Sequence, residues 1–344
     1  MTTAVKLGRF SLQRCHLLAL VVALTGCSAQ VDSDPGVDLA EQGLLLSPHW
    51  QVAGGGPVRF SPSGQLVATG STAAKAQLLA AGNGSVVKSL PIRHTANAAA
   101  FSPDGSLLAV GSGGGGSTRG LRMFQVASGT QLFEASAHSN GTTAVSWSPT
   151  SNTLFATSGG DRTTKLWNSN GTVIRTLQEG TYGRRINGMS FAPDGKTLAS
   201  NVSGNIHIWS VSDGVLVREI LTSGTGKGLA YSPDGKLIST GTELYDAGSG
   251  TRVQSFVWPS GSVTSTTFTR DGSAVVVGGE DFPNSVDDPT IRYFRVSDGA
   301  ELVAFHGLGS SSAYVKSVAI SPDGSLLGYT LATDGLTAVA TSPF

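Results

Sequence analysis

Apolar residues recur along this chain in short alternating runs that end in the same kind of turn. The clearest copy is Phe-Ser-Pro-Asp-Gly at 101–105. In the run-ins to other copies, residues two apart are large and apolar, as in Val145 and Trp147 or Leu229 and Tyr231. A period of two predicts a strand with one packing face. The copies begin at residues 60, 101, 147, 191, 231, 268 and 320, which are 41, 46, 44, 40, 37 and 52 apart. Such spacing is typical of a solenoid, propeller or array.

The residues of the turn favour a tight hairpin. Pro103 presets the φ that the second position of a turn requires, and Asp104 suits the next position through bonds to nearby backbone. Gly105 then accepts a positive φ without steric cost. A type I turn followed by a left-handed glycine makes a three-residue hairpin loop with a bulge. Each copy therefore predicts a β-hairpin.

Two more strands follow each hairpin. A continuous apolar run such as Leu107–Val110 after the turn suits a strand buried on both faces. An alternating run such as Ile206–Trp209 predicts a third strand, and the glycine turn at 212–214 leads into a fourth strand at 215–217. Four strands in a unit of about 43 residues predict a propeller blade.

The best copy, from His138 to Trp167, resembles a WD40 repeat, and more loosely the propeller repeats of the Tol system. His138 precedes the first strand, Ala-Thr-Ser-Gly-Gly-Asp ends at Asp161, and Leu-Trp ends at Trp167. The resemblance implies a buried hydrogen-bond network of His138, Thr157 or Ser158, Asp161 and Trp167. Other copies match in part. In the second blade His94 is present but Phe124 replaces the tryptophan, and in the fourth blade Trp209 has no preceding histidine.

The last repeat supplies only three strands before the chain ends at Phe344. The strand-like residues 43–47 precede the first full repeat, so we expect them to complete the last blade and close the ring, which removes open sheet edges. The predicted fold is an all-β, seven-bladed propeller of four-stranded antiparallel blades over residues 43–344.

Composition excludes several classes of function. The 344 residues carry no net formal charge, and without residues 1–26 there remain 20 basic and 23 acidic residues, a net charge of −3. Nucleic-acid binding requires a basic face, so we expect no nucleic-acid partner. Both cysteines lie within the first 27 residues, which excludes a disulfide framework in the repeats.

The N-terminus has the features of an export signal. Lys6, Arg9 and Arg14 precede a short apolar run at 16–24, and Leu24-Thr25-Gly26-Cys27 follows. The last four residues resemble the lipobox of bacterial lipoproteins. The resemblance implies a signal peptide at 1–26, lipid on Cys27, a flexible tether over 27–42, and a lipid-anchored protein of the cell envelope. Because Ser28 follows the cysteine, the outer membrane is expected in a Gram-negative host. An ordinary secretory signal is the alternative.

Three loops are longer than a propeller requires, and long loops often carry function. They are residues 113–116, 178–186 and 280–289. We predict that they bind a protein partner, through the candidate residues Gly114, Arg184, Arg185, Glu280, Asp281, Asp287 and Asp288. The acidic loop at 280–289 lacks the regular spacing of a calcium loop, so no metal and no cofactor are predicted.

No catalytic set is apparent in the sequence. The residues expected nearest the central channel are mainly Ala, Ser, Thr and Gly, and no Gly-x-Ser-x-Gly stands between a strand and a helix. The favoured hypothesis is a membrane-anchored, non-enzymatic interaction scaffold outside the cytoplasm. The alternative is a propeller with a channel site, either a lactonase-like hydrolase or a ligand- or metal-binding protein.

Overall fold

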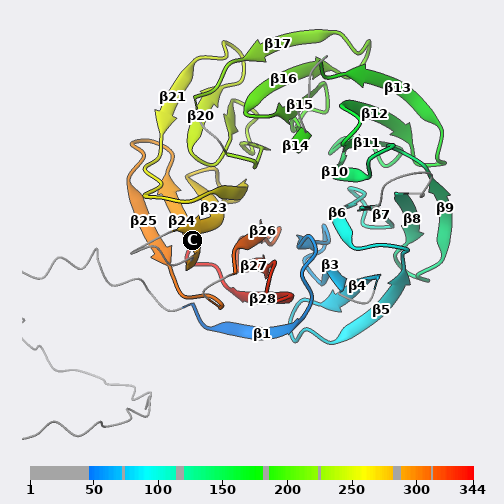
Figure 1. Cartoon of the computed structure of the whole chain (residues 1–344), viewed down its shortest axis with the longest axis horizontal. Coiled ribbons are helices and arrows are strands. Elements are labelled where there is room, and N and C mark those ends of the chain that lie inside the picture. The colour runs from blue at the N-terminus through cyan, green and yellow to red at the C-terminus, as the bar shows by residue number, and fades with distance from the viewer. Residues whose placement is uncertain are drawn as a thin grey trace, which may run out of the picture. The chain divides into compact units, whose positions relative to one another are not determined.

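Seven four-stranded antiparallel sheets stand side by side in a ring around a central opening (Figure 1). This computed structural model describes residues 46–71, 74–113, 120–180, 186–223, 226–281, 288–310 and 313–344. All seven predicted hairpins are present, each as the first two strands of a sheet. The prediction of an all-β, seven-bladed propeller is therefore confirmed.

The blades are numbered along the chain, and each is given from its innermost strand to its outermost. Blade 1 is β2 (Arg59–Phe60), β3 (Leu66–Ser71), β4 (Lys75–Ala80) and β5 (Val86–Pro91); blade 2 is β6 (Ala96–Phe101), β7 (Leu107–Ser112), β8 (Leu121–Gln125) and β9 (Gln131–Ala135); blade 3 is β10 (Thr142–Trp147), β11 (Leu154–Gly159), β12 (Thr163–Asn168) and β13 (Val173–Gln178). Blade 4 is β14 (Ile186–Phe191), β15 (Thr197–Val202), β16 (Asn205–Ser210) and β17 (Leu216–Ile220); blade 5 is β18 (Ala230–Tyr231), β19 (Leu237–Ser239), β20 (Glu243–Asp246) and β21 (Arg252–Ser255); blade 6 is β22 (Val263–Phe268), β23 (Ala274–Asp281), β24 (Asp288–Arg295) and β25 (Glu301–Phe305); blade 7 is β26 (Val315–Ile320), β27 (Leu326–Leu331), β28 (Leu336–Thr341) and β1 (Pro48–Ala53).

Burial within a blade follows the sequence pattern. The continuous apolar run of β11 is buried at every position after Leu154, as predicted for a second strand. The outermost strand β13 is mostly exposed, and its one fully buried residue is Leu177. Burial within a sheet therefore decreases from the second strand to the outermost strand, which faces solvent.

The recurring turn is held by its own side chains. Ser102 Oγ donates to Asp104 Oδ1 at 2.6 Å, and the Ser106 amide donates to the same oxygen at 3.0 Å. Gly105 has a φ of 72°, the left-handed conformation that the sequence predicts. A side chain at Gly105 would also meet the ring of Pro62 from the preceding blade, so the turns pack against one another.

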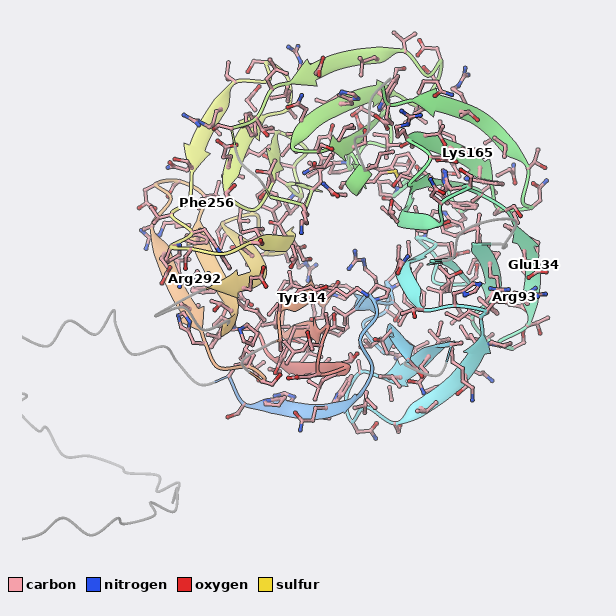
Figure 2. All side chains as sticks on the ribbon, viewed as in Figure 1. Arg93, Glu134, Lys165, Phe256, Arg292 and Tyr314 are labelled. Atoms are coloured by element: carbon pink, nitrogen blue, oxygen red, sulfur yellow. The ribbon has the colours of Figure 1, made fainter. Side chains whose placement is uncertain are left out.

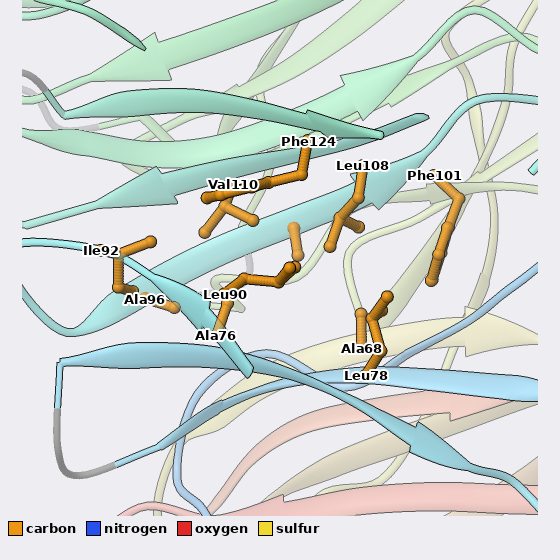
Figure 3. Close-up of a cluster of buried hydrophobic side chains, with 11 residues drawn as sticks. Ala68, Ala76, Leu78, Leu90, Ile92, Ala96, Phe101, Leu108, Val110 and Phe124 are labelled. Carbon is orange, nitrogen blue, oxygen red and sulfur yellow. The ribbon is translucent and has the colours of Figure 1, made fainter. Parts of the chain in front are cut away.

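The hydrophobic core lies between blades rather than within one. One cluster joins Leu78 and Leu90 of blade 1 to Phe101, Leu108 and Phe124 of blade 2 (Figure 3). The other clusters likewise lie between neighbouring blades. Because each blade buries apolar surface against its neighbours, closing the ring completes the core.

The ring is closed by the N-terminal strand, as predicted, but by different residues. β1 pairs with β28, so that Trp50 lies opposite Val339 and Ala53 opposite Leu336 (Figure 1). For the predicted segment 43–47 the bounds were wrong where they can be compared: the strand begins at Pro48, residues 46 and 47 lie before it, and residues 43–45 lie outside the described residues. Trp50 is buried and donates from Nε1 to the Ala81 carbonyl of blade 1 at 2.7 Å, which joins the last blade to the first.

The blades belong to one unit of the chain, Gly43–Phe344. Across the described ranges, no helix has the length and apolar character needed to cross a membrane. The predicted signal peptide, Cys27 and the tether lie outside the described residues.

Candidate interaction face and central channel

The two faces of the ring differ in what they carry. Every first strand runs towards a Pro-Asp-Gly-type turn on one face, here named the turn face. The first strands begin on the opposite face, here named the entry face. The entry face also receives the connections between second and third strands and those between blades, which include the three long loops of the sequence.

Four of the seven predicted partner-binding residues fall outside the part of the chain that the structure describes. Gly114, Arg184, Arg185 and Asp287 lie outside the described residues. The predicted loop at 280–289 was wrong at both ends, because β23 and β24 extend into it. Asp281 pairs with Asp288 and Glu280 with Pro289, so these residues continue the hairpin of blade 6.

Glu280 lies near the end of β23, at the central channel. It is half-buried and lines a cavity of about 440 Å3 at the entry-face end of the channel. Its backbone is fixed on both sides: its amide donates to the Ser262 carbonyl at 3.0 Å, and its carbonyl accepts from Trp258 Nε1 at 3.0 Å. The length of β23 therefore brings a carboxylate to the rim of the channel.

A β-bulge recurs near the start of the first strand in five blades. At the equivalent position of each of these blades, the first strand contains one extra residue that has no partner in the second strand. Such bulges change the direction in which side chains point. The bulged residues are Asn97, Thr143, Asn187, Thr264 and Lys316. All five line the channel cavity.

Several bulged side chains join neighbouring blades. Asn97 Nδ2 donates to the Thr142 carbonyl at 3.2 Å, Thr143 Oγ1 donates to the Ile186 carbonyl at 3.0 Å, and Thr264 Oγ1 donates to the Val315 carbonyl. Lys316 Nζ donates at 3.0 Å to the carbonyl of Gly55, in the link from β1 to β2. The other three carbonyls belong to the first residue of the next blade's first strand, so the channel wall also holds the blades together.

Three basic side chains line the same cavity, and sequence reasoning missed them. They are Arg59, Lys227 and Lys316. The expected lining of small and hydroxyl residues is present, but these cations stand within it. The two lysines could have been found by comparing equivalent positions of the repeats. Four residues before the first residue of each turn motif, blades 2 to 7 carry Asn97, Thr143, Asn187, Lys227, Thr264 and Lys316.

In blade 3 the structure brings four of the predicted network residues together. Trp167 Nε1 donates to Thr157 Oγ1 at 2.8 Å, and Thr157 Oγ1 lies 2.8 Å from His138 Nε2. His138 Nδ1 lies 2.8 Å from Asp161 Oδ1. The Ser158 hydroxyl lies 3.3 Å from that of Thr143 instead, so Thr157 is the hydroxyl in the network.

The environment of His138 favours its neutral form. Burial lowers the pKa of His138, and the charge and hydrogen bond of Asp161 offset this only in part. A neutral ring donates from Nδ1–H to Asp161 and accepts the Thr157 hydroxyl proton at Nε2. Every polar group of the network then has a partner, which makes His138 a structural residue.

Blade 4 builds a network around an acid that the sequence did not single out. The Glu179 side chain is fully buried in the link between blades 3 and 4. Its Oε2 accepts from Ser200 Oγ at 2.9 Å and from Trp209 Nε1 at 3.1 Å. Thr164 Oγ1 of blade 3 donates to Oε1 at 2.6 Å. Glu179 thus serves the tryptophan of a blade that has no histidine before its first strand.

His207 completes the blade 4 network. Its Nδ1 lies 2.9 Å from Glu179 Oε2, and its Nε2 lies 3.5 Å from Glu219 Oε1. Burial works against the charged ring, but the hydrogen bond and charge of Glu179 and the charge of Glu219 outweigh it and raise the pKa of His207 above its ordinary value. No motif in the sequence pairs His207 with Glu179, which lies 28 residues earlier.

Within the described ranges, no group of three or more His, Cys, Asp or Glu side chains is arranged to hold a metal ion. Among the described residues that line the channel cavity, Glu280 is the one carboxylate.

The comparison with protein families supports the repeat assignment. The family "WD domain, G-beta repeat" matches residues 129–168 and 171–210. Each matched span begins with the outermost strand of one blade and ends with the third strand of the next. The first span contains His138 and the second contains Glu179. The predicted resemblance to WD40 repeats is therefore confirmed for these two repeats.

Similar curated proteins share segments of the chain. Telomerase protein component 1 of Rattus norvegicus is 28% identical over 239 residues, 56% of this chain and 9% of that protein. Autophagy-related protein 16 of Arabidopsis thaliana is 39% identical over 93 residues, 26% of this chain and 18% of that protein. Small ribosomal subunit protein RACK1y of Oryza sativa subsp. japonica is 27% identical over 173 residues, 46% of this chain and 49% of that protein. The chain thus spans about half or less of the relatives it matches.

Proposed function

We propose that this propeller is a non-enzymatic interaction scaffold that holds a protein partner on its entry face. The observation that carries the proposal is a closed seven-bladed ring with WD40 repeats, whose blades present different side chains at equivalent positions of that face. Two of the similar proteins are named as a telomerase component and a small ribosomal subunit protein, which are parts of larger assemblies. A rigid scaffold with a varied rim suits the same role here.

The rim of blades 4 and 5 offers the best contact surface among the described residues. Leu221 is 74% exposed and Val257 is 79% exposed. Leu221 directly follows the buried Ile220 at the end of β17, and Val257 directly follows the buried Phe256, which lies just beyond the end of β21. The equivalent positions carry Pro91 in blade 1 and Gln178 in blade 3. Large apolar side chains at neighbouring, equivalent positions are typical of an interface. We infer that the partner contacts Leu221 and Val257.

Partner capture with matched variants tests this proposal. The full chain is immobilised and incubated with extract of its own host, and retained proteins are measured for wild type, Leu221→Asp, Val257→Asp and Val87→Asp. Val87 is 47% exposed on the outer strand of blade 1 and serves as the control. We expect the first two variants to lose a specific partner at least tenfold, while Val87→Asp retains it. Equal retention by all three variants would refute the contact surface.

The same proposal includes a lipid anchor at Cys27, in the cell envelope of a bacterial host. It rests on the resemblance of Leu24-Thr25-Gly26-Cys27 to a lipobox. Several acyl chains anchor a protein stably where one chain does not. Labelling of the host with a radioactive fatty acid is expected to mark wild type and to leave Cys27→Ala unmarked. Equal labelling, or recovery of wild type in the soluble fraction, would contradict the anchor.

A further inference from the structure

We propose that the entry-face end of the channel binds a small phosphate-type anion between Arg59 of blade 1 and Lys316 of blade 7. This site is separate from the proposed partner contacts at Leu221 and Val257. It lies where the last blade meets the first, at the junction that β1 closes.

The cations interrupt a regular lining. Arg59 directly precedes the first residue of the turn motif in blade 1. The other blades carry small residues at this position, which are Ala100, Ser146, Ser190, Ala230, Thr267 and Ala319. Arg59 is therefore the one charged residue in a layer of small side chains. Lys316 occupies the bulge step, where blades 2, 3, 4 and 6 carry an amide or a hydroxyl. Arg59 has no charged counterpart in the other blades, and Lys316 has one, Lys227 of blade 5, so the repeat pattern requires neither charge.

Among the described residues, no acid forms an ion pair with Arg59 or Lys316. Arg59 Nη1 donates only to neutral acceptors, the Val58 carbonyl at 2.7 Å and Ser317 Oγ at 3.0 Å. Lys316 donates to the Gly55 carbonyl at 3.0 Å. Burial lowers the pKa of both Arg59 and Lys316, which reflects their partial loss of water. A partly desolvated cation without a counterion costs stability, and a bound anion removes that cost.

Donors remain for such an anion. Within the described residues, Nε and Nη2 of Arg59 have no hydrogen-bond acceptor. Ser317 Oγ already accepts from Arg59 and from the Val58 amide at 3.3 Å, so its own hydrogen is left to donate. The planar guanidinium suits two parallel bonds to a phosphate or carboxylate group.

The cavity has the size and charge for a small ligand. Its volume of about 440 Å3 lies within the range of small-molecule sites. Lys227 of blade 5 adds a third positive charge to the lining, and Tyr314 stands beside the central opening (Figure 2). Glu280 of blade 6 is the opposing charge, and it favours a position of the anion towards blades 7 and 1.

Calorimetric titration of the full chain with inorganic phosphate and with pyrophosphate, at constant ionic strength in chloride, tests this site. We expect saturable binding, with tighter binding of pyrophosphate, because it offers more charge and more oxygens to the three cations. Arg59→Gln and Lys316→Gln are each expected to weaken binding about tenfold or more. The control Lys236→Gln removes an exposed lysine of the turn face, 3.6 Å from Asp234, and is expected to bind as wild type.

Folding of each variant is checked by circular dichroism and by its melting temperature in chloride. Arg59→Lys keeps the charge but not the planar fork, so intermediate affinity is expected, and it carries the test if Arg59→Gln does not fold. The bound anion should also raise the melting temperature of wild type, because only the folded ring holds the site. Absence of saturable binding by both anions, or equal weakening by Lys236→Gln, would overturn the proposal.

Discussion

Blades 3 and 4 bury a tryptophan at the same position and satisfy it in different ways. In blade 3, Trp167 donates to Thr157, which contacts His138, which in turn contacts the partly exposed Asp161. In blade 4, the carboxylate of Glu179 accepts directly from Trp209, Ser200 and His207. The comparison teaches that the buried indole N–H needs a buried acceptor, which is a hydroxyl held by histidine in blade 3 and a carboxylate in blade 4.

The two networks also hold charge differently. In blade 3 the buried ring of His138 is neutral and the charge of Asp161 lies towards solvent. In blade 4 a buried carboxylate is balanced by His207, whose pKa is raised, and Thr164 ties that carboxylate to blade 3. Breaking a buried network that contains a charge costs more stability than breaking a neutral network. Substitutions in the network of blade 4 should therefore destabilise the protein more than those in blade 3.

Removal of the Glu179 carboxylate should have the largest effect. Glu179→Leu leaves the buried donors Thr164 and Ser200 without their acceptor, leaves Trp209 only its 3.3 Å bond to Ser200 Oγ, and leaves His207 without its buried counterion. We therefore expect a loss of about 3 to 5 kcal/mol in the free energy of unfolding. Equilibrium unfolding in urea measures it. Glu219→Leu is the control, because within the described part of the chain this half-exposed acid has two polar partners, His207 and Asn205. A loss below 1 kcal/mol in Glu179→Leu would show that water replaces the carboxylate.

A smaller loss of stability is expected when the network hydroxyl of blade 3 or of blade 4 is removed. Thr157→Val keeps the shape of the side chain but leaves Trp167 Nε1 and His138 Nε2 unpaired, at a cost of about 2 kcal/mol. Ser200→Ala removes the equivalent hydroxyl of blade 4, but Trp209 Nε1 keeps its bond to Glu179, so about 1 kcal/mol is expected. Urea unfolding of both variants, with the exposed Thr153→Val as control, gives the order. Equal losses would mean that the indole of blade 3 has another acceptor.

Much of the fold follows from local patterns in the sequence, which is why it was predictable. The turn at 101–105 has its own side-chain bonds and its own backbone conformation, so its recurrence reports the hairpins directly. The N-terminal strand was predicted in the wrong place because the run Leu44–Leu46 looks more apolar than Pro48–Ala53. On an outer strand only alternate residues are buried, and Trp50 between the exposed His49 and Gln51 carries that weaker signal.

The site residues were harder to predict because they depend on neighbouring blades. An acid such as Glu179 is usually exposed, and only donors from two blades make its burial favourable. Lys316 and Asn97 face the channel because a bulge shifts the alternation of their strands, which a strict period of two does not include. Glu280 was predicted in a loop because the acidic residues around it resemble one, whereas pairing of β23 with β24 extends the hairpin.

The smallest expected effect is on the pH dependence of stability, where the contributions of His207 and His138 should change in opposite directions. Because the pKa of His207 is raised in the fold, its contribution to stability is fully present below about pH 6.5 and is lost as pH rises through the folded pKa. Because the pKa of His138 is lowered, the folded state resists a proton that the unfolded chain accepts, so the contribution of His138 falls as pH drops below about 6.5. The two blades should respond to acid in opposite directions.

Single histidine variants separate the two responses. The loss of unfolding free energy in His207→Gln is expected to be larger at pH 6 than at pH 8.5, since the charged ring is what the variant removes. The loss in His138→Gln is expected to be smaller at pH 5.5 than at pH 8, since acid already weakens wild type there. Urea unfolding at matched ionic strength measures both. Losses that change with pH in the same direction would contradict the assignment of a neutral ring to blade 3 and a charged ring to blade 4.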